Sequence, residues 1–416
     1  PRMKGNLLRL VGPGLLVAAT GVGAGDLATG AFSGAQLGLA VLWAVVVGAF
    51  LKFVLTEGLA RWQIATGETL LKGAVTRLGP VVKFGFGIYL VGWSFFVGAA
   101  LISACGVTAH ALVPVFDDPT TGKIVFGIAL SLLGMALALM GGYRLFEKVM
   151  SVAIGIMFVT VVVTAVMLKP AWGQVAMGTL VPSIPQLDGA GLVWTVALMG
   201  GVGGTLTVLC YGYWIREEGR DGPESMRIVR IDLGIGYAVT MFFGLAMVVI
   251  GSMIKVDGRG ASLVVDLAAK LEEPLGAFGR WAFLIGAFGA VFSSLLGVWQ
   301  AVPYLFADYL GLVGGKREGR LDPKQVTKSR PYRAYLVLLA VVPMVGLFMK
   351  FREVQKYYAV IGALFIPMLA LVLLVLNGRK ALVGRWRNAW TTSLVLILAL
   401  ALFLLLGYFD IRRRFG

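Results

Sequence analysis

Gly21-Val-Gly-Ala-Gly-Asp26 is a glycine-rich run that carries a single acid inside a long apolar segment. Asp26 is the only charged residue between Arg9 and Lys52. A carboxylate inside a segment long enough to cross a bilayer costs about 3 kcal/mol on insertion scales. The glycines weaken the helix and let bare backbone carbonyls approach a ligand. We therefore expect a broken membrane helix whose one acid belongs to the binding site of a transporter.

The composition indicates a polytopic membrane protein. Of 416 residues, 58% are hydrophobic and only 14% are charged, against about 25% charged in soluble domains. The 57 glycines permit close helix packing in lipid. Cys105 and Cys210 both lie in apolar runs, which argues against a disulfide framework or a thiolate metal cluster. The formal charge of +16 does not indicate nucleic acid, because the basic residues collect in short segments between apolar runs.

The apolar runs predict an all-α chain with eleven transmembrane helices in a single domain over 1–416. The expected spans are 10–31, 36–60, 84–113, 124–142, 149–168, 190–214, 232–254, 281–309, 333–349, 357–377 and 388–409. If the N-terminus is cytoplasmic, the inside segments hold 24 of the 37 Lys and Arg residues. This bias predicts a multi-pass protein of the cell membrane, as in a bacterial inner membrane, with its N-terminus in the cytoplasm.

A second glycine cluster interrupts the sixth expected span. Gly200-Gly-Val-Gly-Gly-Thr205 is followed by Thr207 and Tyr211. Corresponding interruptions in two halves of a chain indicate an inverted-repeat transporter. We expect a first repeat over 1–170, a second over 190–380 and a peripheral helix at 388–409.

Several motifs resemble those of the Nramp family of proton-linked divalent metal transporters, within the amino acid-polyamine-organocation superfamily. They are Gly12-Pro-Gly-Leu-Leu, Leu-Thr-Glu-Gly-Leu-Ala-Arg61 with Ala65-Thr-Gly-Glu-Thr-Leu70, Gly142-Tyr-Arg-Leu-Phe-Glu147, Gly178-Thr-Leu-Val-Pro-Ser-Ile-Pro185, and Ser293-Ser294. The resemblance implies a 5+5 inverted-repeat, LeuT-like fold in which helices 1 and 6 are broken.

The chain departs from this family at the metal-binding motifs. Where the family carries Asp-Pro-Gly-Asn, this chain has Gly23-Ala-Gly-Asp26, so Gly23 replaces a ligating acid. The family's Met-Pro-His motif aligns near Thr207-Val-Leu209, which has neither a thioether nor an imidazole. Without a soft ligand, preference for transition metals loses its basis. Loss of the histidine also weakens the expectation of proton coupling.

The candidate site is centred on Asp26, as a cation ligand or a proton carrier; the alternative is a structural group that binds the broken helix ends. Backbone carbonyls near Gly21, Gly23 and Gly25, and those of Gly203 and Gly204, are further candidate ligands, although the second cluster also suits helix packing. Thr205, Thr207 and Tyr211 are candidates to line the site, unless each bonds its own helix. Ser293 and Ser294 are candidates for a sodium site, with bonding to the preceding helical turn as the alternative.

Other polar residues are expected to be structural. Glu57 and Arg61 are expected to pair at the membrane interface, and Lys52 to extend toward the lipid headgroups. His110, the only histidine, is expected to be a satisfied side chain near the outer surface. Trp93 is expected to serve in packing. The sequence contains no phosphate loop or polar catalytic acid pair, so we expect neither an enzyme nor a cofactor.

The leading hypothesis is a secondary transporter that moves a cation by alternating access, with a hard ion such as Mg²⁺, Na⁺ or Mn²⁺ as substrate. One alternative is a Na⁺-coupled transporter of a small organic or anionic solute. Another is a non-transporting membrane receptor or scaffold. The expected partners are the substrate, a coupling ion (Na⁺ or H⁺) and the lipid bilayer, without nucleic acid.

Overall fold

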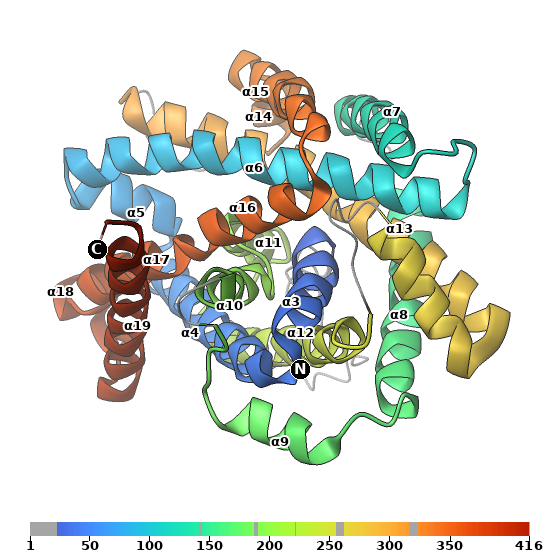
Figure 1. The fold of residues 1–416 in the computed structure, drawn as a ribbon. Helices are drawn as coiled ribbons and strands as arrows, with labels where there is room; N and C mark the ends of the chain where they lie inside the picture. The colour runs from blue at the N-terminus through green and yellow to red at the C-terminus, as the bar shows by residue number, and fades with distance from the viewer. Residues whose placement is uncertain are drawn as a thin grey trace, which may run out of the picture.

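The computed structural model describes residues 23–140, 144–186, 190–220, 222–254, 262–315 and 323–415, and within these ranges the chain is helical without strands (Figure 1). The first half contains η1 (Ala24–Thr29), α3 (Gly30–Leu37), η2 (Gly38–Val41), α4 (Leu42–Thr66), α5 (Leu70–Arg77), α6 (Pro80–Leu112), α7 (Pro119–Met140), α8 (Arg144–Met167) and α9 (Trp172–Leu180).

The second half begins with a span in two pieces, α10 (Ala190–Gly201) and α11 (Tyr211–Glu217), joined through the 3-10 helix η3 (Leu206–Cys210). It continues with η4 (Pro223–Ser225), α12 (Met226–Gly251), α13 (Leu263–Val313), α14 (Pro323–Lys328), α15 (Arg330–Val341), η5 (Val342–Phe348), α16 (Phe351–Ala363), α17 (Phe365–Asn377), α18 (Lys380–Val383), η6 (Gly384–Trp386) and α19 (Trp390–Phe415).

Local sequence explains the helix boundaries beside the second span. Helix α4 ends at Gly67, whose φ of 69° is readily available to glycine. Thr69 then caps α5, because its hydroxyl accepts the backbone N–H of Lys72 at 3.3 Å. Helix α6 starts with Pro80 in its first turn, where a missing N–H costs nothing. These signals separate two long membrane helices by one short helix.

The all-helical, multi-pass architecture expected from the sequence is confirmed, but the count of eleven is not. By length and composition, nine helices of the described ranges are able to cross a membrane, or ten if the bent pair Ile154–Met167 and Trp172–Leu180 is one span. This pair turns by 117°, and its second helix, α9, lies in the segment between the expected spans 149–168 and 190–214. Most of the expected first span, 10–31, lies outside the described residues.

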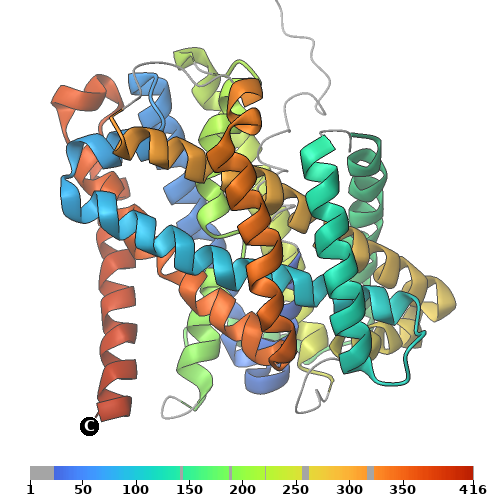
Figure 2. The ribbon, with the colours of Figure 1, turned by 90° about the horizontal axis from the view of Figure 1, so that it is seen from above.

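The two interrupted segments lie at the centre of the bundle. Figures 1 and 2 show α3 and α10 enclosed by α4, α12 and α16, and η1 packs against α10, α12 and α16. Helix α19 stands at the perimeter and packs against α17 and α4.

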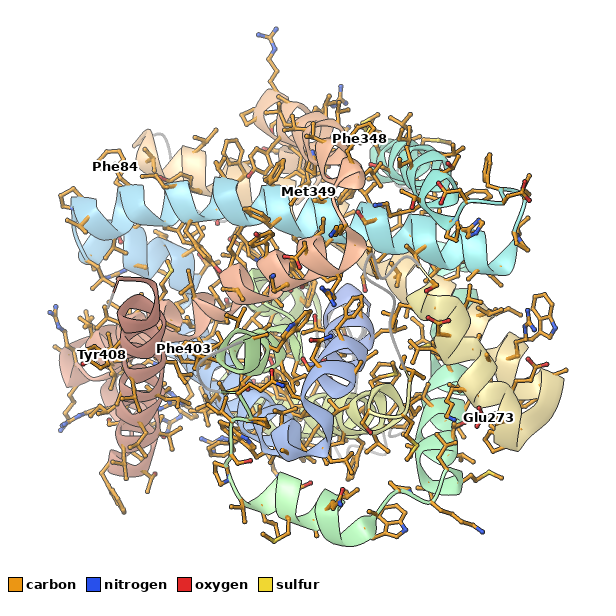
Figure 3. All side chains as sticks on the ribbon, in the orientation of Figure 1. Phe84, Glu273, Phe348, Met349, Phe403 and Tyr408 are labelled. Atoms are coloured by element: carbon orange, nitrogen blue, oxygen red, sulfur yellow. The ribbon has the colours of Figure 1, made fainter. Side chains whose placement is uncertain are left out.

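Large apolar side chains cover the outside of the bundle. Phe84, Phe348 and Tyr408 lie on the perimeter in Figure 3 and are 58%, 78% and 57% exposed. Soluble proteins rarely expose so many large apolar groups together. This surface suits lipid, whereas polar side chains such as Asp26 and Lys52 lie inside the bundle.

Candidate functional site

The sixth span is broken where the sequence predicts it. Helix α10 ends at Gly201, and helical structure resumes at Leu206. Between them, Gly203 and Gly204 have φ angles of 72° and 82°, a region that residues with a Cβ adopt only at a cost. The break removes the regular helical hydrogen bonds and leaves carbonyls of this segment available to other partners. The glycine cluster therefore builds an interruption rather than only a packing surface.

The described part of the first span approaches this break through its glycines. A Cβ on Gly25 would lie 2.6 Å from the carbonyl oxygen of Gly201, so only glycine fits there. A side chain on Gly23 would collide with Ser294 of α13. An acid at position 23, as in the family motif, does not fit this packing. Gly21 lies outside the described residues.

Asp26 lies at the junction of the two segments. Its side chain is fully buried in the π-helix η1. Both carboxylate oxygens accept the backbone N–H of Gly203, at 3.3 and 3.4 Å. The structure therefore brings together Asp26 and the second glycine cluster, which the sequence identifies separately.

The side chain of Lys52 does not lie where the sequence predicts it. It is 1% exposed, and its ammonium donates to the carbonyls of Gly200 and Val202, both at 2.5 Å, and to the carbonyl of Gly204. It also interacts electrostatically with Asp26. Extension to the headgroups is wrong because the broken span offers unpaired carbonyls and a carboxylate within reach of α4. A buried ammonium without such partners would be prohibitively costly.

Hydroxyl groups and one indole surround the pair. The hydroxyls of Tyr237 and Thr56 are 2.7 Å apart. Trp93 donates its indole N–H to the Thr205 hydroxyl at 3.0 Å, so Trp93 has a polar role besides the expected packing. Tyr358 of α16 also lies close to the Thr205 side chain.

Asp26 interacts electrostatically with the hydroxyls of both Tyr237 and Tyr358. The site is therefore lined by oxygen groups from four separate elements: η1, the span-six break, α12 and α16. Thr205, which was expected to line it, is tied to this group through Tyr358.

The other predicted site residues are placed differently. The Tyr211 hydroxyl donates to Asp232 at 3.2 Å, and Arg220 contacts the same carboxylate at 3.4 Å, so Tyr211 belongs to a separate cluster. Thr207 is buried in η3.

The two serines differ from each other. Ser293 donates to the carbonyl of Ala290 in its own helix, at 3.1 Å. This is the bond to the preceding helical turn that was the alternative to a sodium site. Ser294 faces Gly23 of the first span. The sodium site at Ser293 and Ser294 remains a prediction.

Glu57 and Arg61 pair at 2.7 Å as expected, but not at an exposed interface. Glu57 is 8% exposed and Arg61 5%, and Arg230 of α12 contacts the second carboxylate oxygen at 2.8 Å. The second arginine adds two hydrogen bonds to the other oxygen of this buried carboxylate.

His110 is also more buried than expected. It is 5% exposed, because Gly122 of α7 packs directly against its ring. Its Nδ1 has no hydrogen-bond partner among the residues that the structure describes. The expectation of a satisfied surface side chain is therefore wrong.

Most of the groups that could bind a ligand at this site are oxygen atoms. The described ranges contain no group of three or more His, Cys, Asp or Glu residues arranged to hold a metal ion. Main-chain carbonyls, one carboxylate and hydroxyls are hard ligands, which suit hard cations. Sequence reasoning missed Lys52, Tyr237 and Tyr358. A signal existed for Lys52, since it and Asp26 are the only charges between Arg9 and Glu57.

Comparison with known proteins agrees with this architecture. The family model for Nramp, described as natural resistance-associated macrophage protein-like, matches residues 14–411. The chain belongs to the Nramp family. An uncharacterised protein of Pasteurella multocida is 25% identical over 74% of this chain and 72% of its own length. The divalent metal cation transporter MntH of Acidiphilium cryptum is 23% identical over 98% of this chain and 92% of its own.

Solved structures show the same fold. A mutant of the Eremococcus coleocola manganese transporter superposes with a TM-score of 0.70 at 18% identity, covering 99% of this chain and 88% of that one. The structure of MhsT in complex with L-phenylalanine gives a TM-score of 0.58 at 14% identity, over 95% of this chain and 98% of that one. The Nramp-family chain is thus a multi-pass membrane protein with the inverted-repeat transporter fold that the motifs implied.

Proposed function

We propose that this Nramp-family protein is a secondary active transporter that moves a cation across the membrane by alternating access. The central site is Asp26 together with the carbonyls of the broken sixth span. One observation carries the proposal: the fully buried Asp26 carboxylate meets the break of span six, where both of its oxygens accept the backbone N–H of Gly203.

The donors favour a hard cation as substrate. Carbonyl and carboxylate oxygens suit Mg²⁺, Na⁺ and Mn²⁺ better than softer metals. Two relatives support metal transport by their names, as a divalent metal cation transporter and a manganese transporter. Position 23 of this chain is a glycine packed against Ser294, so the one acid of the motif lies three residues later than in the family, at Asp26.

Uptake of labelled Mg²⁺, Mn²⁺ and Na⁺ into proteoliposomes tests this proposal. We expect flux of at least one ion with the wild type, and a loss of at least tenfold for Asp26→Asn. Asp308→Asn is the matched control, since Asp308 is also buried but bonds to Tyr213. Equal flux through wild-type and Asp26→Asn protein would remove this carboxylate from the mechanism. Absence of flux for every ion and solute, with folded protein, would favour a receptor or scaffold.

A small organic or anionic solute is the second candidate, and the position of Lys52 favours it. The ammonium occupies three carbonyls that a cationic substrate would need, while a solute without a positive charge would not compete for them. Thermal unfolding with amino acids or small acids, with and without Na⁺, separates the candidates. Stabilisation by a solute only in the presence of Na⁺ would replace the cation as the proposed substrate.

The orientation follows from the charge bias and is part of the proposal. We place the protein in the cell membrane with its N-terminus in the cytoplasm, so the loop before α7 faces outward and α5 faces inward. A membrane-impermeant maleimide added to intact cells should label Asp118→Cys and spare Lys72→Cys. The reverse labelling pattern would invert the topology.

A further inference from the structure

We propose that the loop between α17 and α19 binds the headgroup of an anionic phospholipid. The loop runs from Gly378 through α18 and η6 to Arg387. It carries four exposed basic side chains on a closed, hydrogen-bonded turn of chain beside a lipid-facing helix. In the proposed topology it lies on the cytoplasmic side of the membrane, and the site would serve whatever substrate the protein carries.

The loop concentrates positive charge that no nearby acid balances. Its four exposed basic side chains are Arg379, Lys380, Arg385 and Arg387. The sequence has no Asp or Glu between Glu353 and Asp410, and none of the four pairs with a carboxylate of the described ranges. By contrast, the basic residues of α5, Lys72 and Arg77, both pair with Glu68. The charge of the α17–α19 loop is therefore available to an anion from outside the protein.

Hydrogen bonds close the loop and fix it to the bundle. The backbone N–H of Asn388 donates to the Asn377 carbonyl at 2.9 Å, so the two ends of the loop meet. The Asn388 amide also donates to the carbonyl of Leu373 at 3.1 Å. Arg61 of α4 donates to the Asn388 side-chain oxygen at 3.0 Å and to the Trp386 carbonyl at 3.3 Å. The basic side chains thus stand on a pre-organised platform, which lowers the entropy lost on binding.

The loop lies where lipid headgroups are expected. It joins two segments that are long and apolar enough to span a membrane, Phe351–Asn377 and Trp390–Tyr408. Figures 1 and 2 place α18 and α19 at the perimeter of the bundle. Trp390, the first residue of α19, is 77% exposed, and tryptophan is enriched at membrane–water interfaces. Beyond it, α19 exposes the apolar side chains of Leu394, Ile397 and Leu398.

An anionic phospholipid matches both parts of this surface. Its phosphate oxygens can accept paired N–H donors from arginine, and its acyl chains can pack on the exposed apolar side chains of α19. The Arg385 guanidinium lies 5.2 Å from the centre of the Trp386 ring, which helps to orient it. A zwitterionic headgroup brings a cation that the four basic side chains would repel. Basic clusters next to a membrane span are typical of anionic-lipid sites.

Thermal unfolding in lipid nanodiscs tests the proposal. The full-length protein is placed in nanodiscs of phosphatidylcholine alone, or of phosphatidylcholine and phosphatidylglycerol at a ratio of about three to one. We expect Tm to be at least about 3 °C higher in the mixture. Native mass spectrometry after extraction should find phosphatidylglycerol retained about tenfold more than phosphatidylcholine. Equal Tm values and equal retention of the two lipids would overturn the lipid site.

Variants assign the lipid to the loop. The quadruple variant Arg379→Gln/Lys380→Gln/Arg385→Gln/Arg387→Gln should lose both the Tm difference and the selective retention; Arg385→Gln/Arg387→Gln replaces it if that protein does not fold. The matched control changes four exposed basic residues elsewhere on the proposed cytoplasmic side, Arg227, Lys328, Arg330 and Arg333, to Gln. It should keep the preference for phosphatidylglycerol. An equal loss in both quadruple variants would mean that the effect is one of total charge, and would overturn a site on this loop.

Inorganic phosphate, added to the protein in detergent, separates a lipid from a soluble anion. We expect it to stabilise the wild type no more than chloride does at equal ionic strength, because phosphate has no acyl chains to pack on α19. Stabilisation by phosphate that the quadruple variant loses, without a preference between the lipids, would assign the loop to a soluble anion instead. Ion flux plays no part in these measurements. A lipid preference without ion transport would refute the proposed function alone, and ion transport without a lipid preference would refute this site alone.

Discussion

Lys52→Met removes the ammonium from the centre of the bundle while keeping most of the side-chain volume. Asp26 would then remain fully buried, with the N–H of Gly203 as its remaining charge-stabilising contact. The carbonyls of Gly200, Val202 and Gly204 would lose their donor. Leaving a buried carboxylate without its compensating positive charge costs about 3–5 kcal/mol.

The neutral double variant measures how much of that lost stability comes from leaving the Asp26 carboxylate without its positive partner. In Asp26→Asn/Lys52→Met, no charge is left behind, so we expect at least half of the lost stability to return. The coupling free energy of the double-mutant cycle should be about 2 kcal/mol or more. Additive single effects would show that the two side chains do not interact.

Thermal unfolding in detergent, followed by intrinsic fluorescence, is the assay. For a chain of this size, a loss of 3–5 kcal/mol lowers Tm by about 5 °C. Lys123→Met combined with Asp26→Asn is the matched cycle, since Lys123 is equally buried but contacts Met349 instead, and its coupling should be close to zero. A Lys52→Met protein as stable as the wild type would refute the burial of a charged pair at this site.

Three further outcomes follow from the same contacts. Gly25→Ala should abolish transport and reduce the yield of folded protein, because the new Cβ would lie 2.6 Å from the Gly201 oxygen; flux assays and size-exclusion profiles check this. Thr205→Val should cost about 1 kcal/mol in thermal unfolding, because the Trp93 indole loses its acceptor at 3.0 Å; an unchanged Tm would contradict the bond. Burial raises the pKa of Glu68, but bonds from Arg77 and Lys72 outweigh it and hold the pKa below its usual 4.5. Glu68 therefore stabilises the fold by about 0.5 kcal/mol at pH values above its usual pKa, and this stabilisation is lost as the pH falls through the lowered pKa. Glu68→Gln should speed hydrogen exchange in α5 at neutral pH, and in acid the variant and the wild type should exchange at the same rate.

The long apolar runs made the membrane architecture predictable, since a bilayer demands long apolar helices. The glycine cluster at Gly200–Gly204 marked the broken span, because left-handed backbone needs glycine. Asp26 stood out as a lone acid. The exact number of spans was less predictable, since α9 is a short helix that lies between two of the expected spans.

The partners of Asp26 were harder to predict because they depend on tertiary packing. A lysine near the middle of α4 can extend to the headgroups or inward, and the sequence gives only its position along the helix. Tyr237 and Tyr358 reach the site from α12 and α16, which lie far along the chain. Tyr211, adjacent to the break in sequence, instead bonds to Asp232.

An experimental density map of the wild-type protein in lipid, resolved well enough to trace side chains, tests the central claim most directly. We expect the Lys52 side chain to run inward from α4 and end among the carbonyls of Gly200, Val202 and Gly204, with Asp26 facing the same point. A Lys52 side chain directed to the headgroups, or an Asp26 carboxylate open to bulk water, would contradict the account.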